Sequence, residues 1–163
     1  MKSMLLIRHA KSSWNDPHEK DFDRPLNERG RRDAPVMAAR LKEKLPVIDL
    51  FISSPANRAL STAISFARAY GLGSTDILQI PELYHAPPHV FYDVIAAIPD
   101  HLDTVAIFSH NGGITDFVNG LTETKVDVMP TCSIYGVKAD ITKWSSFYDA
   151  SKNFWFFDYP KKL

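Results

Sequence analysis

Short apolar segments of strand length alternate along this chain with segments of helical periodicity, and this alternation constrains the fold more than any other feature. The segments 4–8, 50–54 and 104–110 read MLLIR, LFISS and TVAIFSH, as expected of strands buried on both faces. Between the first two, apolar residues recur every three or four positions from Ala34 to Leu45. The alternation predicts an α/β fold, a three-layer sandwich in which helices cover both faces of a largely parallel central sheet.

The rest of the chain continues this pattern. Helical spacing follows Pro55, recurs over 90–98, and begins again at Gly112-Gly113. The segments 133–139 and 153–159 have strand character and are expected to add antiparallel strands at one edge of the sheet.

Composition narrows the class of protein. A chain of 163 residues fits one domain over 1–163, since domains typically contain about 100–200 residues. Basic and acidic residues both number 19, so no global field would recruit nucleic acid or an anionic membrane. The single cysteine, Cys132, can form no internal disulfide, and no segment has the length of a signal-peptide core or a membrane span. We expect a cytoplasmic, monomeric protein.

Four consecutive aromatic residues, at 154–157, could suggest a platform for stacking nucleic-acid bases. On a regular strand they would alternate, with Phe154 and Phe156 on one face and Trp155 and Phe157 on the other. Because the net charge is zero, packing under helices explains them better, and no nucleic-acid partner is expected.

Polar residues follow three of the predicted strands. The first strand ends in Arg8-His9, and Arg58 lies in the first turn of the helix after the second strand. The 104–110 segment ends in His110 and is followed by Asn111. Ligands of open α/β sheets bind outside the carboxyl ends of parallel strands. If these strands are parallel neighbours, two imidazoles and two guanidiniums meet in one crevice, a combination suited to phosphate.

Five separated segments resemble, in order, the motifs of the histidine phosphatase superfamily. They are RHAKSSWN (8–15), PLNERGRRDA (25–34), SSPANRALSTA (53–63), PELY (81–84) and IFSHNGGI (107–114). The short chain is most similar to the small phosphohistidine phosphatase branch, the SixA type. This resemblance implies a phosphoglycerate mutase-like fold and phosphatase activity.

The resemblance also implies roles for individual residues. His9 would attack phosphorus and become a phosphohistidine, which water would then hydrolyse. Arg8, Arg58 and His110 would hold the phosphoryl oxygens as charge develops on them. The side chain of Asn15 and the backbone of Asn111 would assist.

Glu82 occupies the position of the family's general acid, after a short strand that would end at Pro81. The following segment lacks the family's glycine, which leaves the placement of Glu82 open, and His85 there is expected to be an exposed loop residue. Ala10 replaces the usual glycine and Lys11 the usual acid. No metal or other cofactor is expected.

Three functions therefore remain. The first is a phosphatase that acts on phosphohistidine in a protein of the histidine-containing phosphotransfer type. The imidazole leaving group of this substrate depends less on a strong general acid. A phosphatase for small phosphoesters would depend on Glu82, since an alkoxide leaving group needs a proton. A phosphate-binding module without turnover would use the same pocket residues.

Overall fold

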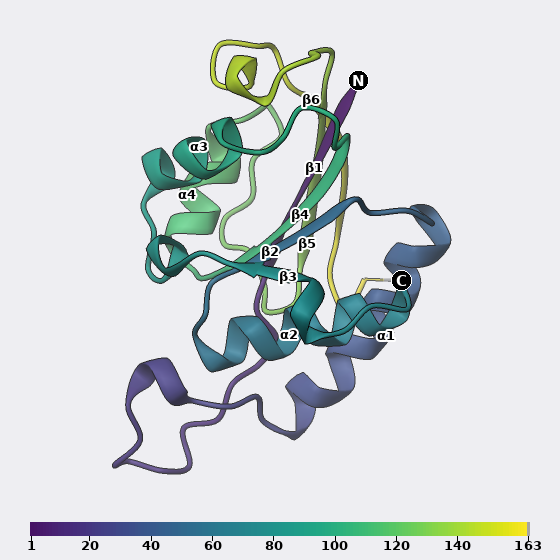
Figure 1. Cartoon of the computed structure of the whole chain (residues 1–163). Helices are drawn as coiled ribbons and strands as arrows, with labels where there is room; N and C mark the ends of the chain where they lie inside the picture. The colour runs from purple at the N-terminus through teal and green to yellow at the C-terminus, as the bar shows by residue number, and fades with distance from the viewer. Residues whose placement is uncertain (163) are drawn as a thin grey trace.

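A six-stranded sheet with the strand order β3-β2-β4-β1-β5-β6 forms the centre of the computed structural model, which describes residues 1–162 (Figure 1). Strands β1 to β4 run parallel, and β5 and β6 are antiparallel at one edge, as the sequence predicted. The strands are β1 (Lys2–Arg8), β2 (Leu50–Ser53), β3 (Ile77–Gln79), β4 (Thr104–Ser109), β5 (Ile134–Ala139) and β6 (Asn153–Asp158).

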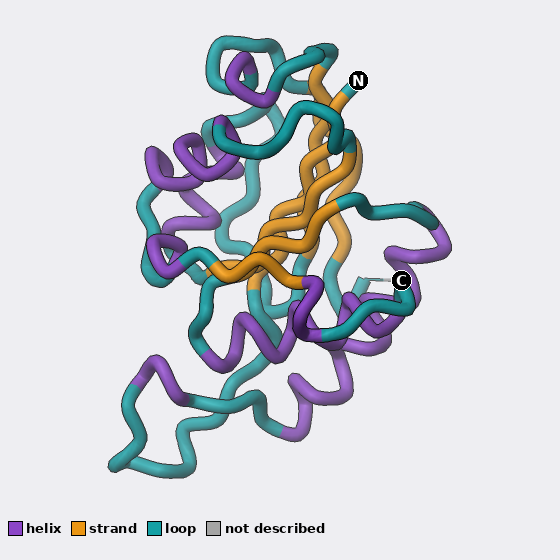
Figure 2. The backbone as a smooth tube through the Cα atoms, viewed as in Figure 1, coloured by secondary structure: helices purple, strands orange, loops and turns teal. Residues whose placement is uncertain are grey.

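Helices cover both faces of this sheet, which confirms the three-layer prediction (Figures 1 and 2). One face carries α1 (Glu28–Lys44) and α2 (Asn57–Ala69), and the other carries α3 (Pro88–Ala96) and α4 (Gly113–Asn119). Single 3-10 turns lie at 21–23, 74–76, 81–83 and 144–146. Within residues 1–162 no helix is both long and apolar enough to cross a membrane.

Strand β1 shows why the apolar run at the N-terminus is continuous. Leu5 and Ile7 pack under α1 and α2, whereas Met4 and Leu6 pack under α3 and α4, and all four side chains are fully buried. Successive side chains of a strand point to opposite faces, so a strand covered on both faces needs apolar residues at every position. The run ends where the strand itself ends, at Arg8.

The segment between β1 and α1 leaves the sheet and folds back onto the start of α1. The carbonyl oxygen of Lys11 accepts the backbone N–H of Asn27 (3.0 Å), whose side chain caps α1 by accepting the N–H of Gly30 (2.9 Å). A Cβ at Gly30 would lie 2.1 Å from the Lys11 carbonyl oxygen. Glycine at this position therefore lets the helix and the segment make contact.

The predicted alternation of the aromatic residues in β6 is wrong. Phe154 and Phe157 both contact the ring of Tyr135, on the α3–α4 side, while Trp155 and Phe156 join the core on the α1–α2 side. The pairing of β5 with β6 shifts by one residue beside Gly136. Such a bulge interrupts the two-residue period, so side chains beyond it change face.

Candidate active site

The carboxyl ends of three parallel strands adjoin, as the sequence pattern required. β4 lies between β1 and β2, and backbone hydrogen bonds continue just past the strands, from the N–H of His9 to the carbonyl of Ser109 (3.1 Å) and from the N–H of Ser54 to the carbonyl of Phe108 (3.0 Å). These bonds fix His9, Ser54 and His110 at one edge of the sheet.

A pocket of about 270 Å³ opens at this edge. It contains four side chains that carry a permanent positive charge and one carboxylate, and this balance favours a bound anion. The lining residues are Arg8, His9, Lys11, Ser12, Trp14, Asp21, Arg24, Arg58, His85, Asn111 and Thr131.

His9 has the geometry of a nucleophile. Its Nδ1 lies 2.7 Å from the carbonyl oxygen of Ala10, which can only accept, so Nδ1 carries the proton and Nε2 keeps its lone pair. Burial, helped by the nearby charges of Arg58 and Arg8, outweighs the hydrogen bond to Ala10 and lowers the pKa of His9 to about 3. At neutral pH the ring is therefore uncharged and able to attack phosphorus.

His110 lies against His9, with ring centroids 5.3 Å apart. Its Nε2 is 2.8 Å from Oγ of Ser54, while its buried Nδ1 has no partner within residues 1–162. Burial, with the neighbouring His9 and Arg58, holds the pKa of His110 far below the usual value. A neutral His110 that accepts the Ser54 hydroxyl proton keeps an N–H at Nδ1 for a ligand.

Two arginines, Arg8 and Arg58, line the same pocket as His9. The Nη1 of Arg8 donates to the carbonyl of Met129 (2.7 Å), while its buried Nε lacks a partner in the described part of the chain. Arg58, which is 3% exposed, donates from Nη1 to the carbonyl oxygen of Asp21 (2.7 Å) and from Nη2 to its Oδ2 (3.0 Å). Burial and the nearby Arg58 lower the pKa of Arg8. An anion bound here would offset the repulsion between the charges of Arg8 and Arg58. It would also accept hydrogen bonds from the unpaired donors of Arg8 and His110.

Asp21 is the one carboxylate of the pocket, and it is ionised. Burial opposes its ionisation, but hydrogen bonds from Tyr84 (2.6 Å), Arg24 (2.9 Å) and Arg58 outweigh burial and hold its pKa well below the usual range. The Nε2 of His85 lies 3.3 Å from the same carboxylate. Asp21 thus orients the donors around it and has no proton to give.

The structure brings some of the sequence-predicted residues together in the pocket and leaves others outside it. Arg8, His9, Arg58 and Asn111 line one pocket, and His110 lies against the His9 ring. The side chain of Asn111 accepts a hydrogen bond from Thr115.

Glu82 does not join them, contrary to the sequence expectation. The strand before it ends at Gln79, and the 3-10 turn Pro81–Leu83 buries Leu83 completely, where its carbonyl accepts the hydroxyl of Ser109 (2.8 Å). This turn leaves Glu82 exposed in a separate pocket, beside Val90 and Asp93. Glu82 therefore does not line the pocket that contains His9.

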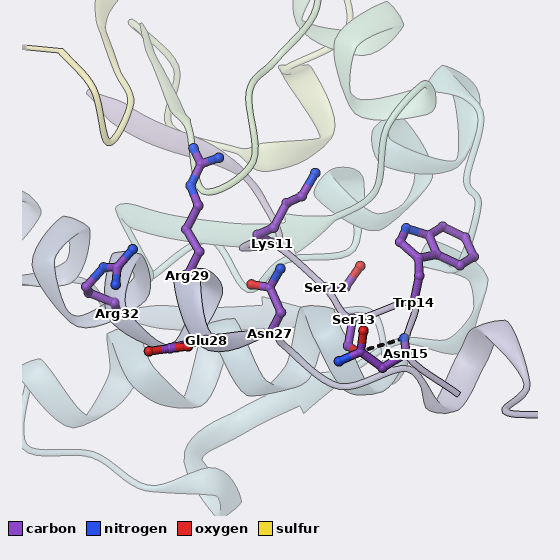
Figure 3. A pocket seen from close by; sticks show the side chains of 9 residues that line it. All are labelled: Lys11, Ser12, Ser13, Trp14, Asn15, Asn27, Glu28, Arg29 and Arg32. Atoms are coloured by element: carbon purple, nitrogen blue, oxygen red, sulfur yellow. Dashed lines mark hydrogen bonds between the residues drawn. The ribbon is translucent and has the colours of Figure 1, made fainter. Parts of the chain in front are cut away.

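Asn15 also lies outside the His9 pocket. It is exposed and lines an adjacent groove, where its backbone N–H donates to Oγ of Ser13 (3.1 Å; Figure 3). The reason is the course of the chain, because the segment between β1 and α1 extends away from the sheet before it returns at α1 (Figure 1).

Sequence reasoning assigned no site role to several residues of the pocket. Asp21 and Arg24 come from the segment between β1 and α1, Thr131 precedes β5, and His85 follows the Pro81–Leu83 turn. His85 is exposed, as expected, but it also faces the pocket, with its backbone in the left-handed region (φ 56°). Their local sequence carries no periodic signal that could have indicated the pocket. Residues 1–162 contain no group of three histidine, cysteine or acidic side chains arranged to hold a metal ion.

Comparison with known proteins identifies the family to which this chain belongs. The profile of the histidine phosphatase superfamily (branch 1) matches residues 4–84. An uncharacterised chloroplastic protein of Arabidopsis thaliana is 26% identical over 158 residues, which are 92% of this chain and 72% of that protein. An uncharacterised protein of Mycobacterium leprae is 33% identical over 119 residues, 71% of either chain.

The fold of a solved structure supports the same family. A crystal structure from Agrobacterium tumefaciens, assigned as the phosphohistidine phosphatase SixA, superposes with a TM-score of 0.82 at 27% identity and covers 98% of both chains. The chain belongs to the histidine phosphatase superfamily and is a phosphatase.

Proposed function

We propose that this phosphatase hydrolyses phosphohistidine in a partner protein through a covalent phosphohistidine on its own His9. The observation that carries the proposal is the buried, uncharged His9, whose free Nε2 lies among cationic side chains. A phosphoryl group in the pocket would place its negative oxygens among these donors, which are already fixed before the reaction begins.

Two displacements complete the reaction. In the first, Nε2 of His9 forms a bond to phosphorus while the bond from phosphorus to the leaving atom breaks. In the second, water attacks phosphorus, the bond to His9 breaks, and inorganic phosphate leaves with the water oxygen. The unpaired donors of Arg8 and His110, together with Arg58, would stabilise the charge on the oxygens in both steps.

The proton supply favours phosphohistidine over an alkyl phosphate. An alkoxide leaving group needs a proton from a positioned acid, whereas the imidazole of a phosphohistidine can take its proton from solvent and leave as a neutral ring. Asp21 is held ionised, and Glu82 lines another pocket. Among the residues that line the pocket, the structure thus offers no protonated carboxyl group.

A trapping experiment tests the proposal. The wild type, a His9→Ala variant and a His89→Ala control would be mixed with a ³²P-phosphohistidine peptide and, separately, with a phosphomonoester. His89 is an exposed histidine that does not line the pocket. We expect transient acid-labile label on the wild type and the control, with faster turnover of the phosphohistidine peptide. Loss of His9 should slow turnover by about 10⁴-fold or more.

Other outcomes would contradict the proposal in different ways. Faster turnover of the phosphomonoester would favour the small-molecule phosphatase. Equilibrium binding of phosphate without label or turnover would indicate a binding module. Label that persists on the His9→Ala variant would refute the nucleophile itself.

We further propose that the chain works in the cytoplasm as a monomer with a single domain. The single, buried Cys132 supports a reducing compartment, and one sheet joins all the described strands. The proposed domain, 1–163, includes Leu163, which lies outside the described residues. Fractionation of cells and light scattering of the purified protein would test these proposals.

A further inference from the structure

A second concave surface lies directly beside the active-site pocket. This groove, of about 550 Å³, is formed by the segment after β1 and the first turns of α1 (Figure 3). Its lining residues are Lys11, Ser12, Ser13, Trp14, Asn15, Asn27, Glu28, Arg29 and Arg32. Lys11, Ser12 and Trp14 line the active-site pocket as well, so the two cavities adjoin at these three residues.

The groove is basic. It contains three cationic side chains and one carboxylate, that of Glu28. Lys11 and Arg32 are exposed and form no ion pair within residues 1–162, and Arg29 makes only a partly exposed contact with Asp33 (3.3 Å). Lys11 and Arg29 extend to the same side (Figure 3). A neutral protein has thus gathered unpaired positive charge beside its active site.

Trp14 separates the groove from the pocket and is held in place. Trp14 is 75% exposed, an unusual position for a residue with so large an apolar side chain. The guanidinium of Arg24 stacks on the ring at 3.2 Å and is itself fixed by the carbonyl of Ser13 (3.0 Å), Asp21 (2.9 Å) and the hydroxyl of Ser12. An exposed tryptophan held in this way loses little freedom on binding, and tryptophan is enriched at the centres of protein interfaces.

We propose that this basic groove binds an acidic stretch of the polypeptide next to the phosphorylated histidine of the substrate protein. The inference rests on the proposed function and adds the charge of the substrate. Once the phosphoryl group lies in the pocket, the chain that carries it must pass over the rim, and Lys11 and Trp14 form that rim on the groove side. Carboxylates in this stretch would meet the unpaired cations, and its apolar atoms would meet the indole.

The test compares two phosphohistidine peptides of equal length, one flanked by acidic residues and one by serines, with free phosphohistidine as a third substrate. The variant Arg29→Ser/Arg32→Ser removes two cations from the groove without touching the active-site pocket. The matched control Arg31→Ser/Arg68→Ser removes two arginines that line a different pocket. Thermal unfolding would verify that both variants are folded.

We expect the wild type to prefer the acidic peptide by about tenfold in kcat/KM, as two exposed charge contacts would produce. The preference should disappear in the groove variant, persist in the control, and weaken at high salt. All three proteins should hydrolyse free phosphohistidine at equal rates. A wild type without the preference, or a groove variant that retains it, would overturn the inference. Absence of turnover on every phosphohistidine substrate would instead refute the proposed function, and this inference with it.

Discussion

Mild acid should destabilise this protein through its two buried histidines, His9 and His110. His9 is 7% exposed and His110 is 2% exposed, and burial holds both rings neutral in the folded chain. The folded pKa of His9 is about 3, against 6.5 for an ordinary histidine. Between these values the unfolded chain binds a proton that the folded chain does not. Stability is therefore fully present above the unfolded pKa and falls as the pH is lowered below it.

The magnitude follows from these pKa values. At about pH 5 each histidine favours the unfolded chain by about 2 kcal/mol relative to about pH 7.5, so the pair costs about 4 kcal/mol. This is a large share of the roughly 5–15 kcal/mol by which domains are usually stable.

Urea unfolding at the two pH values would measure the loss, with a His9→Gln/His110→Gln variant for comparison. The other four of the six histidines are exposed and common to both proteins, so their contribution cancels. We expect the wild type to lose about 4 kcal/mol more than the variant between about pH 7.5 and about pH 5. If the variant does not fold, NMR titration of the wild-type His9 ring gives the same answer. Equal losses, or a His9 ring that titrates near its ordinary value, would refute the reasoning.

Three further predictions follow from the contacts around the pocket. Glu82→Gln should change kcat/KM for phosphohistidine peptides by less than about twofold, because Glu82 lines a separate pocket; a loss of about 100-fold would restore it as the general acid. Ser54→Ala should lower the free energy of unfolding by about 1–3 kcal/mol, because it removes the partner of the buried Nε2 of His110, and unchanged urea unfolding would contradict this. Gly113→Ala should cost about 3 kcal/mol, since its Cβ would lie 1.7 Å from a backbone carbonyl oxygen, whereas the control Gly73→Ala meets no atom within 4 Å and should be nearly neutral in thermal unfolding.

Much of the site could be predicted from the sequence because it depends on strand ends. A strand buried on both faces must be apolar throughout, so the change to Arg8-His9 marks the end of the strand. Parallel strands place their carboxyl ends at one edge, and this rule brought Arg58 and His110 to the same place. The family motifs add the expected roles of these residues, which the trapping experiment would test.

The residues that were misplaced or missed belong to segments whose direction local sequence does not determine. Glu82 lines a separate pocket and is exposed, while the neighbouring Leu83 is fully buried in the core. Asp21 is held at the pocket by a hydrogen bond from Arg58, more than 30 residues away in the sequence. Arg24 is held there by a hydrogen bond to Ser13 within the long segment between β1 and α1. Neither effect leaves a periodic pattern along the chain.

The sequence by itself determined the layers, the parallel sheet and the edge at which the histidines meet, because periodicity and burial act on neighbouring positions. Tertiary structure alone decided which face the aromatic side chains of β6 occupy, which pocket Glu82 lines, and that Trp14 lines both the active-site pocket and a basic groove. These features depend on a bulge, on the packing of one turn and on contacts of Arg24. Each is a competition between distant groups that is settled only when the whole chain is folded.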